Sequence, residues 1–253
     1  MNVLLLTLGM SIAWQLPADS HQIELIFLDV GQGDALVVRS PEGRVALIDA
    51  GRGWLIGQLG VHGIDSIDFA IATHPHADHI GGMVDVLHNL PVKTYIDNGV
   101  PHTTAIYAQV MAAVAQSEAA YMVAESTTVF LGSVELQFLA PFEDAESLNN
   151  GSIGIVIRYG EFSALVAGDA EVDALNHFIA NGVPDVTVLK ASHHGARDGV
   201  SPAWVSATRP EVVVMLKRQL EQWLASEHSA APATEPTLDL ETIEALRALG
   251  YTE

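Results

Sequence analysis

The sequence predicts an α/β or α+β fold of four layers, in which two packed β-sheets are covered by helices on their outer faces. Short apolar runs separated by turns with glycine or proline are typical of strands. Groups of such strands are followed by helices twice along the chain, an order that indicates packed sheets with helices outside. With 253 residues, 49% of them hydrophobic, the chain is long enough for one large domain with a substantial core.

The first half contains five expected strands and two expected helices. The strands are expected at 23–30, 35–40, 45–50, 66–73 and 92–98. The fourth run is mostly apolar, as in a strand that is buried on both faces. One helix is expected to begin near His79 and to end before Pro91, because proline terminates helices. Another is expected over 103–120, where the apolar spacing is helical and the residues are good helix formers.

The second half repeats this order. Strands are expected within 127–140 and at 152–160, 162–169, 186–192 and 211–216. Helices are expected at 170–182, 201–208 and 239–250. The first of these helices ends at Asn181-Gly182 and the last at Gly250, since Asn and Gly are common at helix C-termini.

The composition excludes several classes of function. The net charge of −20 gives a broadly anionic surface, which favours solubility and repels anionic membranes and nucleic acid. An extended DNA duplex is therefore a disfavoured partner. The chain has no cysteine, so disulfides, zinc ribbons and thiol nucleophiles are excluded. The oligomeric state is left open.

Residues 1–20 are a possible signal peptide, and a single domain is expected over 21–253. The stretch from Val3 to Trp14 is apolar but too short to span a bilayer, and Ala18 is a small residue near its end. This predicts an exported protein, periplasmic or extracellular, with no stable membrane insertion after signal removal. Because the positive N-terminal region of a signal is missing, a buried strand or a membrane-proximal segment is the alternative, and the protein would then be cytoplasmic.

The stretch "AIATHPHADHIGG", residues 70–82, indicates a metal site. His74 and His76 share one face of an extended segment, so both can point at one ion. The chain then turns into a helix, and Asp78 and His79 project from its first turn toward a second position. Imidazole together with carboxylate suits zinc, and also manganese or iron. We therefore predict one or two divalent ions, with zinc favoured and manganese as the alternative.

Two later stretches offer further ligands. Asp169 directly follows an apolar strand, where ligands collect in sheet-based enzymes. It is interpreted as a carboxylate that bridges two cations, and the alternative is an N-cap for the following helix. His193 and His194 follow the next strand. One of them is expected to reach the site while the other bonds backbone, and the sequence does not say which.

These motifs resemble those of a known superfamily. "THPHADHIGG" resembles the metal motif of the metallo-β-lactamase-fold hydrolases. The segments "FLDVGQGDALVV", "VALIDAG", "NNGSIGIVIRYGEFSALVAGD" and "LKASHHG" closely resemble the hydrolase domain of the ComEC competence protein family, over about Ile23 to Pro210. The resemblance implies an αββα sandwich with one or two metals at the sheet edges.

The resemblance also implies roles for individual residues. His74 and His76 would hold one metal, Asp78 and His79 the other, and Asp169 would bridge them. Of the later histidines, His194 is included among the predicted ligands. Three aspartates in the signature strands would either support the ligands or cap turns beside neighbouring glycines; they are Asp29, Asp34 and Asp49.

The chain departs from the superfamily pattern in two places. Asn149, Asn150 and Ser152 stand where many members supply a histidine, as in ComEC-like domains, which implies that one metal is loosely held. The usual Gly-His-Pro turn near the C-terminus is also missing. His228 is the predicted last ligand, Glu235 is a competitor, and a third possibility is that neither binds.

Hydrolysis is the predicted reaction. A water between two divalent cations is acidified enough to supply hydroxide near neutral pH. Asp78 would orient that water or accept its proton, and His193 or His194 would protonate the leaving group or grip the substrate.

Phosphodiesters are the expected substrates, either nucleic acid, as the resemblance implies, or a small diester. Few cations lie near the expected site, where phosphate contacts need them; they are Lys190, Arg197, Lys217 and Arg218. Surface solubilisation explains these four equally well. This composition favours a small diester or single-stranded DNA held mainly by the metals. The alternatives are an amide or ester hydrolase of the β-lactamase or lactonase type, and a non-catalytic metal-binding domain.

Overall fold

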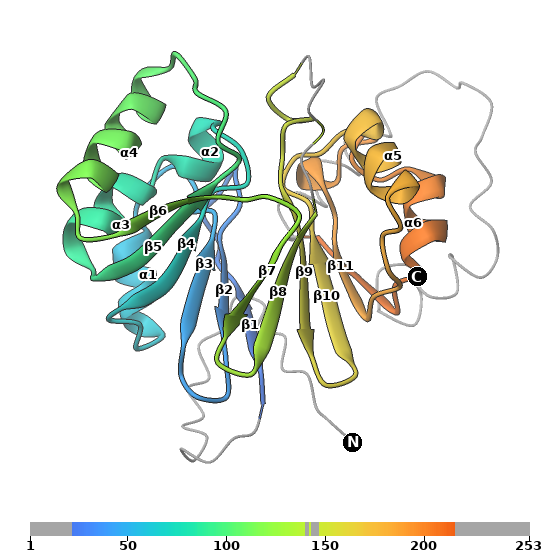
Figure 1. Cartoon of the computed structure of the whole chain (residues 1–253), viewed down its shortest axis with the longest axis horizontal. Helices are drawn as coiled ribbons and strands as arrows, with labels where there is room; N and C mark the ends of the chain where they lie inside the picture. Colours follow the sequence, from blue (N-terminus) through green and yellow to red (C-terminus); the bar gives the residue numbers. More distant parts are fainter. Residues whose placement is uncertain (1–21, 140–141, 143–146, 216–253) are drawn as a thin grey trace. The chain divides into compact units, whose positions relative to one another are not determined.

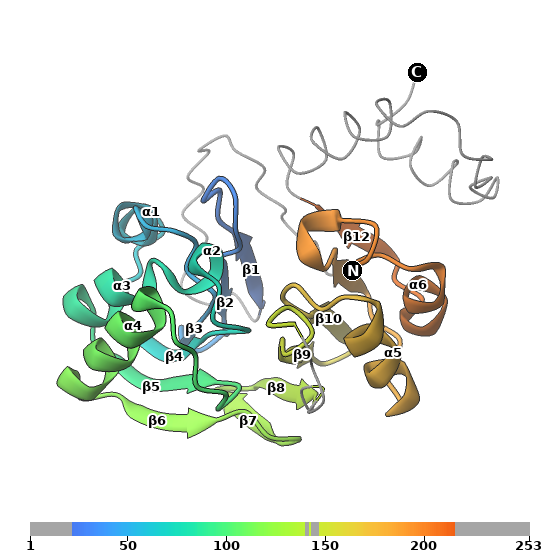
Figure 2. The same cartoon turned by 90° about the horizontal axis from the view of Figure 1, so that it is seen from above.

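Two six-stranded sheets pack against each other, and helices cover the outer face of each (Figures 1 and 2). The computed structural model describes residues 22–139, 142 and 147–215, all of which belong to one compact unit. The four layers confirm the predicted αββα sandwich. The prediction of a single domain over 21–253 extends beyond the described residues and stays a prediction.

The first sheet holds the strands of the first half in chain order. These are β1 (Glu24–Phe27), β2 (Leu36–Arg39), β3 (Val45–Ile48), β4 (Ile67–Ile71), β5 (Val92–Asp97) and β6 (Ala120–Val123). The pairs β1–β2 and β2–β3 are antiparallel, whereas β3 to β6 run parallel. The helices of this half are α1 (Leu55–Val61), α2 (Ala77–Ile80), α3 (Met83–Asn89) and α4 (Ala105–Gln116).

The second sheet has the spatial order β12-β11-β10-β9-β8-β7. Its strands are β7 (Thr128–Leu131), β8 (Val134–Leu139), β9 (Gly154–Tyr159), β10 (Phe162–Val166), β11 (Val188–Lys190) and β12 (Val212–Val214). The strands β10, β11 and β12 run parallel, and the others are antiparallel. The helices α5 (Val172–Ala180) and α6 (Pro202–Thr208) pack on its outer face, and a 3₁₀ turn spans His193–Gly195.

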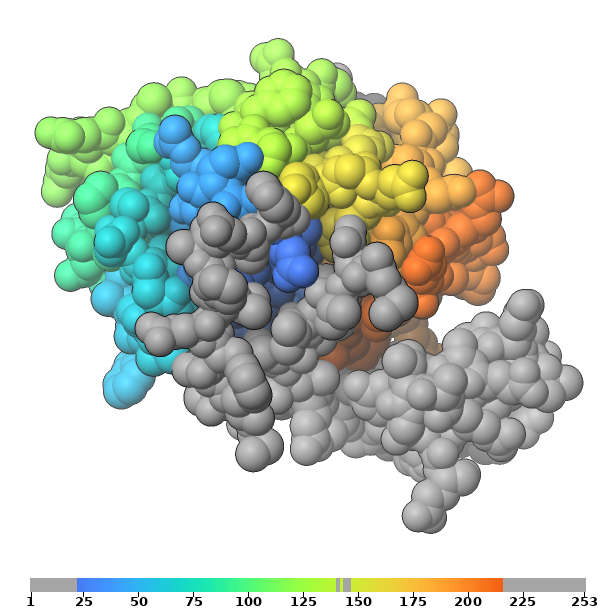
Figure 3. All heavy atoms as spheres, turned by 90° about the horizontal axis from the view of Figure 1, so that it is seen from below, coloured from blue at the N-terminus to red at the C-terminus, as the bar shows by residue number. Residues whose placement is uncertain are grey.

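The period-two alternation of each strand produces the layers. In β2, Leu36 and Val38 face the core between the sheets, while Val37 faces the helices. In β9, Ile157 faces the same inter-sheet core and Val156 faces the second set of helices. Because side chains alternate between the faces of a strand, each sheet is buried on both sides. Seen from below, the described residues of the two halves lie against each other (Figure 3).

Two elements of the first half were not expected. The helix α1 lies in a glycine-rich stretch that lacks the usual capping residues, and its Trp54 N-cap makes no side-chain capping bond. The expected helix over 103–120 is wrong at its end, because α4 stops at Gln116 and β6 follows. Alanine-rich sequence favours helix, but pairing of β6 with β5 outweighs that propensity.

The helix expected after His79 is divided into α2 and α3 at Gly81 and Gly82. A Cβ on Gly82 would lie 2.2 Å from the carbonyl oxygen of Ala50. Only glycine allows this close approach, which holds the start of α3 against the end of β3.

Several predictions fall outside the described residues. These are the signal peptide at 1–20, the helix at 239–250, the candidate ligands His228 and Glu235, and the cations Lys217 and Arg218. In the described part of the chain, none of the helices has the length and apolar character needed to cross a membrane. Export therefore stays a prediction.

Candidate metal centre

Side chains that can hold a cation follow the carboxyl ends of four strands. Asp49 follows β3, His74 follows β4, Asp169 follows β10, and His194 follows β11. Within each sheet the two strands run parallel, so their carboxyl ends meet at one edge, where sheet-based enzymes collect their ligands.

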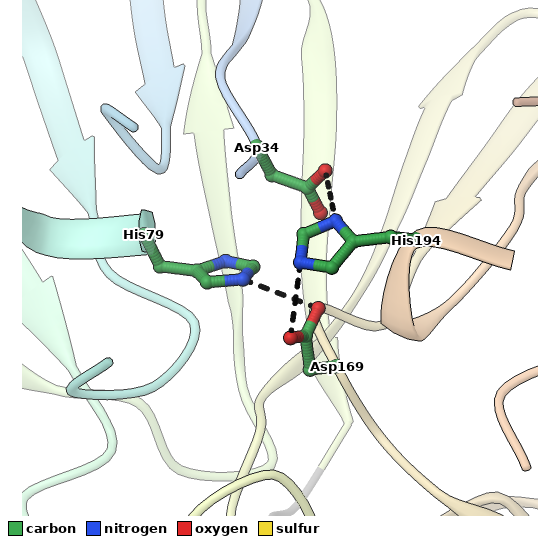
Figure 4. A group of neighbouring side chains, drawn as sticks. All are labelled: Asp34, His79, Asp169 and His194. Atoms are coloured by element: carbon green, nitrogen blue, oxygen red, sulfur yellow. Dashed lines mark ion pairs between the residues drawn. The ribbon is translucent and has the colours of Figure 1, made fainter. Parts of the chain in front are cut away.

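Asp169 forms ion pairs with both His79 and His194 (Figure 4). Its Oδ1 is 3.2 Å from Nε2 of His79, and its Oδ2 is 3.3 Å from Nε2 of His194. Oδ2 also lies 3.9 Å from Nε2 of His74. The predicted bridging carboxylate thus contacts histidines from both halves of the chain.

His79 is oriented by a second buried carboxylate. Its Nδ1 is 2.8 Å from Oδ2 of Asp49. Asp49 also accepts hydrogen bonds from the backbone N–H and the hydroxyl of Thr73, both at 2.8 Å. The Thr73 hydroxyl lies 3.2 Å from Nδ1 of His74. A carboxylate behind a histidine fixes the direction of its other nitrogen, so Asp49 aims Nε2 of His79 at Asp169.

His194 is oriented in a parallel way by Asp34, with Nδ1 3.4 Å from Oδ1 of Asp34 (Figure 4). The other oxygen of Asp34 forms a close ion pair with Nζ of Lys190. Lys190 is only 6% exposed. The prediction that Lys190 is a cation available to substrate phosphates or to solvent is therefore wrong, because its ammonium is buried against Asp34.

The remaining predicted ligands, His76 and Asp78, contact members of the same cluster. Nε2 of His74 is 3.0 Å from Nδ1 of His76. Oδ2 of Asp78 is 3.7 Å from Nε2 of His194 and 3.9 Å from the guanidinium of Arg52. The fold therefore brings together the six predicted ligands that the structure describes, namely His74, His76, Asp78, His79, Asp169 and His194. Their roles as ligands stay predictions.

The structure separates the adjacent histidines His193 and His194. Nδ1 of His193 is 2.8 Å from Oδ1 of Asp198 and 3.9 Å from Oε1 of Glu171. Its Nε2 lies 3.4 Å from Nδ2 of Asn149. Both histidines have positive φ angles, 47° and 54°, which are uncommon for residues other than glycine. This turn directs His194 to Asp169, whereas His193 joins a separate acidic pair.

The neighbouring carboxylates raise the pKa values of the two histidines that contact Asp169, His79 and His194. Burial disfavours the charged form of His79, but Asp49 and Asp169 outweigh it and raise its pKa to about 10. Burial likewise opposes the charged form of His194, whose contacts with Asp169, Asp34 and Asp78 raise its pKa to about 11. The negative charge that raises these two pKa values would also attract a divalent cation.

The other ionisable groups agree with a cation site. The neighbouring His194 imidazole lowers the pKa of Asp78 to about 2, so its carboxylate is charged at neutral pH. Burial raises the pKa of Asp169, but His194 and His79 outweigh it and hold that pKa below its usual range. Burial and the neighbouring His79 lower the pKa of His74, which leaves a neutral imidazole as metal ligands require.

The donor set fits a divalent cation. The groups Asp34, His79, Asp169 and His194 offer atoms that all lie within 4.8 Å of one another. Oδ1 of Asp169 and Nε2 of His79 are buried, and among the described residues neither makes a hydrogen bond of acceptable geometry. Such buried atoms call for an ion or a water.

Sequence reasoning left open or missed several of these contacts. Of the three aspartates with two interpretations, Asp49 and Asp34 lie behind histidines, whereas Asp29 accepts a bond from the N–H of Gly31 and closes a turn. The contact between Arg52 and Asp78 was not anticipated. Its only sequence signal is a cation directly after "DAG", a signal too weak to use alone.

The chain belongs to the metallo-β-lactamase superfamily, because the family model described as "Metallo-beta-lactamase superfamily" matches residues 28–215. Within it, the chain is similar to ComE operon protein 3 of Bacillus subtilis, with 27% identity over 79% of this chain and 29% of that protein. It is also similar to the uncharacterized protein YcaI of Escherichia coli, with 25% identity over 83% of this chain and 27% of that protein. The chain thus spans less than a third of the length of these relatives.

Among solved structures, the chain is similar to MIM-2 metallo-β-lactamase, with a TM-score of 0.52 and 13% identity over 81% of this chain and 88% of that one. Similarity at this level shows the fold alone. The family and the fold are therefore established by comparison, whereas the reaction has to be argued from the site.

Proposed function

We propose that this protein is a metal-dependent phosphodiesterase, acting on single-stranded nucleic acid or on a small diester. One observation carries the proposal: Asp169 lies between the Nε2 atoms of His79 and His194. The Nδ1 atom of each histidine faces a buried aspartate, which is Asp49 for His79 and Asp34 for His194. Such a constellation presents nitrogen and oxygen donors to a divalent ion. The motif resemblance to the ComEC hydrolase domain supports the choice of phosphodiesters.

The residues around the ion would bind and orient the reactants. Divalent cations held there would supply acidified water and would neutralise charge that develops on phosphoryl oxygen. Asp78 is ionised at neutral pH because of its low pKa, so its carboxylate can orient a water or accept its proton. His193 is held by Asp198 through Nδ1, and in this proposal it donates a proton to the leaving oxygen.

The charge of the described surface restricts the substrate. Lys190 is buried and cannot contact phosphates. Arg52 has a side chain that is 62% exposed and lies 3.9 Å from Asp78, so it can contact a phosphate next to the reacting group. With a net charge of −20, the chain offers little attraction to a long duplex. A single strand or a small diester needs fewer such contacts.

The test is a panel of substrates with protein reconstituted in zinc or manganese. An aryl phosphodiester and a single-stranded oligonucleotide are expected to be hydrolysed, whereas a chromogenic cephalosporin and a lactone are not. Asp78→Ala is expected to abolish diester turnover. The exposed Asp85→Ala on α3 is the matched control and is expected to retain it.

Turnover of the cephalosporin or lactone without diester turnover would replace the proposal with amide or ester hydrolysis. A fully metallated protein that hydrolyses none of the four compounds would indicate a non-catalytic metal-binding domain.

A further inference from the structure

The loop between β3 and α1, residues 49–54, begins at the metal centre and ends at an exposed tryptophan. The backbone N–H of Ala50 donates to the carbonyl of His79 at 2.7 Å. The N–H of Gly51 donates to the carbonyl of Asp34 at 2.9 Å. The start of the loop is therefore held in place by the segments that form the cluster around Asp169.

Trp54 is the most exposed of the large apolar side chains that the structure describes. It is 94% exposed, so in this part of the chain no other side chain covers its indole. Its backbone is left-handed, with φ 65° and ψ 18°, a conformation that is costly for any residue with a large side chain. Burial of the indole does not repay this cost, and strained positions of this kind are concentrated at functional sites.

A cation lies two residues before this indole. The side chain of Arg52 is 62% exposed, and its guanidinium is 3.9 Å from Oδ2 of Asp78. Because all peptide bonds in the described chain are trans, the Cα atoms of Arg52 and Trp54 are at most about 7.6 Å apart. One short loop beside the metal centre thus presents a guanidinium and an aromatic face. Proteins that bind single strands of nucleic acid without sequence preference combine these two groups.

The charge of the chain makes an aromatic contact more useful than further cations would be expected to be. The net charge is −20, and Lys190 is buried against Asp34, so few groups can attract phosphates. Stacking of a base on an indole needs no positive charge, since every base has a π-face. Bases in a duplex are stacked on one another, whereas those of a single strand are available to an aromatic side chain.

We propose that Trp54 stacks on a base of a single-stranded nucleic acid whose neighbouring phosphate contacts Arg52. This inference rests on the proposed function and deepens it, because it selects a nucleic acid strand over a small diester that has no base. Stacking of this kind favours the presence of bases without selecting their sequence.

The test measures binding by the full, metal-loaded chain and uses phosphorothioate oligonucleotides, which resist hydrolysis. A labelled single-stranded oligothymidylate is compared by fluorescence anisotropy with an abasic strand of the same length, which has the same charge but no bases. The wild type is expected to bind the oligothymidylate at least about fivefold more tightly than the abasic strand. Trp54→Ala is expected to bind the two strands equally, and Trp54→Tyr, which keeps an aromatic face, to retain most of the difference.

Phe130→Ala is the matched control, because Phe130 is an aromatic side chain on β7 that is 63% exposed. The hairpin that follows Phe130 contacts the turn between β2 and β3, where the N–H of Ser133 donates to Glu42. This turn precedes β3, whereas Asp49 and the loop that bears Trp54 follow it. The control is expected to keep the wild-type preference for bases.

Trp54→Gly tests whether the indole has a structural role instead. Glycine adopts positive φ angles freely, so this variant is expected to unfold within about 4 °C of the wild type and to lose the preference for bases. A larger fall in the unfolding temperature would show that the indole packs against the protein, and it would overturn the inference.

Two other results would also overturn the inference: a preference for bases that persists in Trp54→Ala, or one that is lost equally in Phe130→Ala. A wild-type protein that hydrolyses the aryl phosphodiester but binds both strands equally would remove the inference alone. A wild-type protein that binds neither strand and hydrolyses no diester would remove the inference together with the proposed function. Binding of bases through Trp54 without hydrolysis of any diester would remove only the proposed function.

Discussion

His79 and His194 present the same nitrogen to Asp169 but are supported in different ways. Behind His79, the buried Asp49 accepts hydrogen bonds from the neutral backbone and hydroxyl groups of Thr73. Behind His194, the buried Asp34 is paired with the ammonium of Lys190. The first support disperses the carboxylate charge over neutral donors, and the second neutralises it with an opposite charge.

Both aspartates orient a histidine toward Asp169, but the cost of removing the partner of the aspartate differs between the two. Removing a neutral donor leaves a carboxylate that still has other partners. Removing the buried ammonium leaves the Asp34 carboxylate without its closest counter-charge in a low-dielectric environment, which is more costly. Loss of the partner of Asp34 is therefore expected to lower the free energy of unfolding more than loss of one donor to Asp49.

The largest expected effect comes from the group that both histidines share. Asp169→Asn removes the charge between them, and we expect metal content to fall well below one ion per chain. We also expect diester turnover to fall at least about 100-fold, because bridging and supporting groups each affect metal affinity strongly. Metal analysis and initial rates measure both quantities. The exposed Asp173→Asn is the control, and full metal content in Asp169→Asn would contradict the assignment of the centre.

The next effect tests the charged support. Lys190→Met is expected to lower the free energy of unfolding by about 3–5 kcal/mol, because Asp34 is left buried without its counter-charge. Adding Asp34→Asn to this variant should restore part of the loss. Urea denaturation of the two single variants and the double variant measures the coupling.

The neutral support provides the matched comparison. Thr73→Val removes one hydroxyl donor from Asp49, and its expected cost is about 1–2 kcal/mol. A loss in Thr73→Val as large as that in Lys190→Met would show that the two supports do not differ as described.

The pH dependence of the metal-free protein is a further test. The pKa of His79 is raised to about 10 and that of His194 to about 11, so the native state binds protons more tightly than the unfolded state. Their stabilisation is complete below about pH 6.5 and is lost as pH rises toward about 10. Urea midpoints of metal-free protein should fall over this range. Metal-loaded protein should lack this dependence, since the cation replaces the protons.

Loading the metal at neutral pH should release about two protons, one from each histidine. Calorimetry in buffers of different ionisation enthalpy measures this number. Metal uptake without proton release, or metal-free protein that gains stability between about pH 6.5 and 10, would contradict the charge state assigned to the pair.

The smallest effect on stability is expected for Arg52, which lies beside Asp78 with a largely exposed side chain. Arg52→Ala removes a cation 3.9 Å from Asp78 whose side chain is 62% exposed, so the free energy of unfolding should change by less than about 1 kcal/mol. If Arg52 contacts substrate phosphate, KM for an oligonucleotide should rise severalfold while metal content stays constant. An unchanged KM would remove Arg52 from the substrate contacts.

Much of the fold could be predicted from the sequence because strand alternation and turn residues are local signals. The sandwich and most strands follow from them, whereas α1 and β6 do not. The helix α1 lies among glycines without capping residues. The strand β6 is stabilised by pairing with β5, which a helix-favouring alanine-rich sequence does not reveal.

Part of the candidate site could likewise be predicted from local spacing, and part could not. The spacing of His74, His76, Asp78 and His79 predicted their convergence, because neighbours in an extended segment and a first helical turn have fixed directions. The choice between His193 and His194 depends on a turn with two positive φ angles. No property of the dipeptide itself predicts that turn.

The sequence by itself determined the αββα layers, the local cluster that begins at His74, and the strand-end position of Asp169. The layers follow from the order and periodicity of the elements, and the other two follow from spacing within one short segment. Only the tertiary structure decided that Lys190 is buried against Asp34 and that His194 rather than His193 faces Asp169. Each of these depends on contacts between segments far apart in the chain, and such contacts set burial and charge pairing without leaving a local pattern.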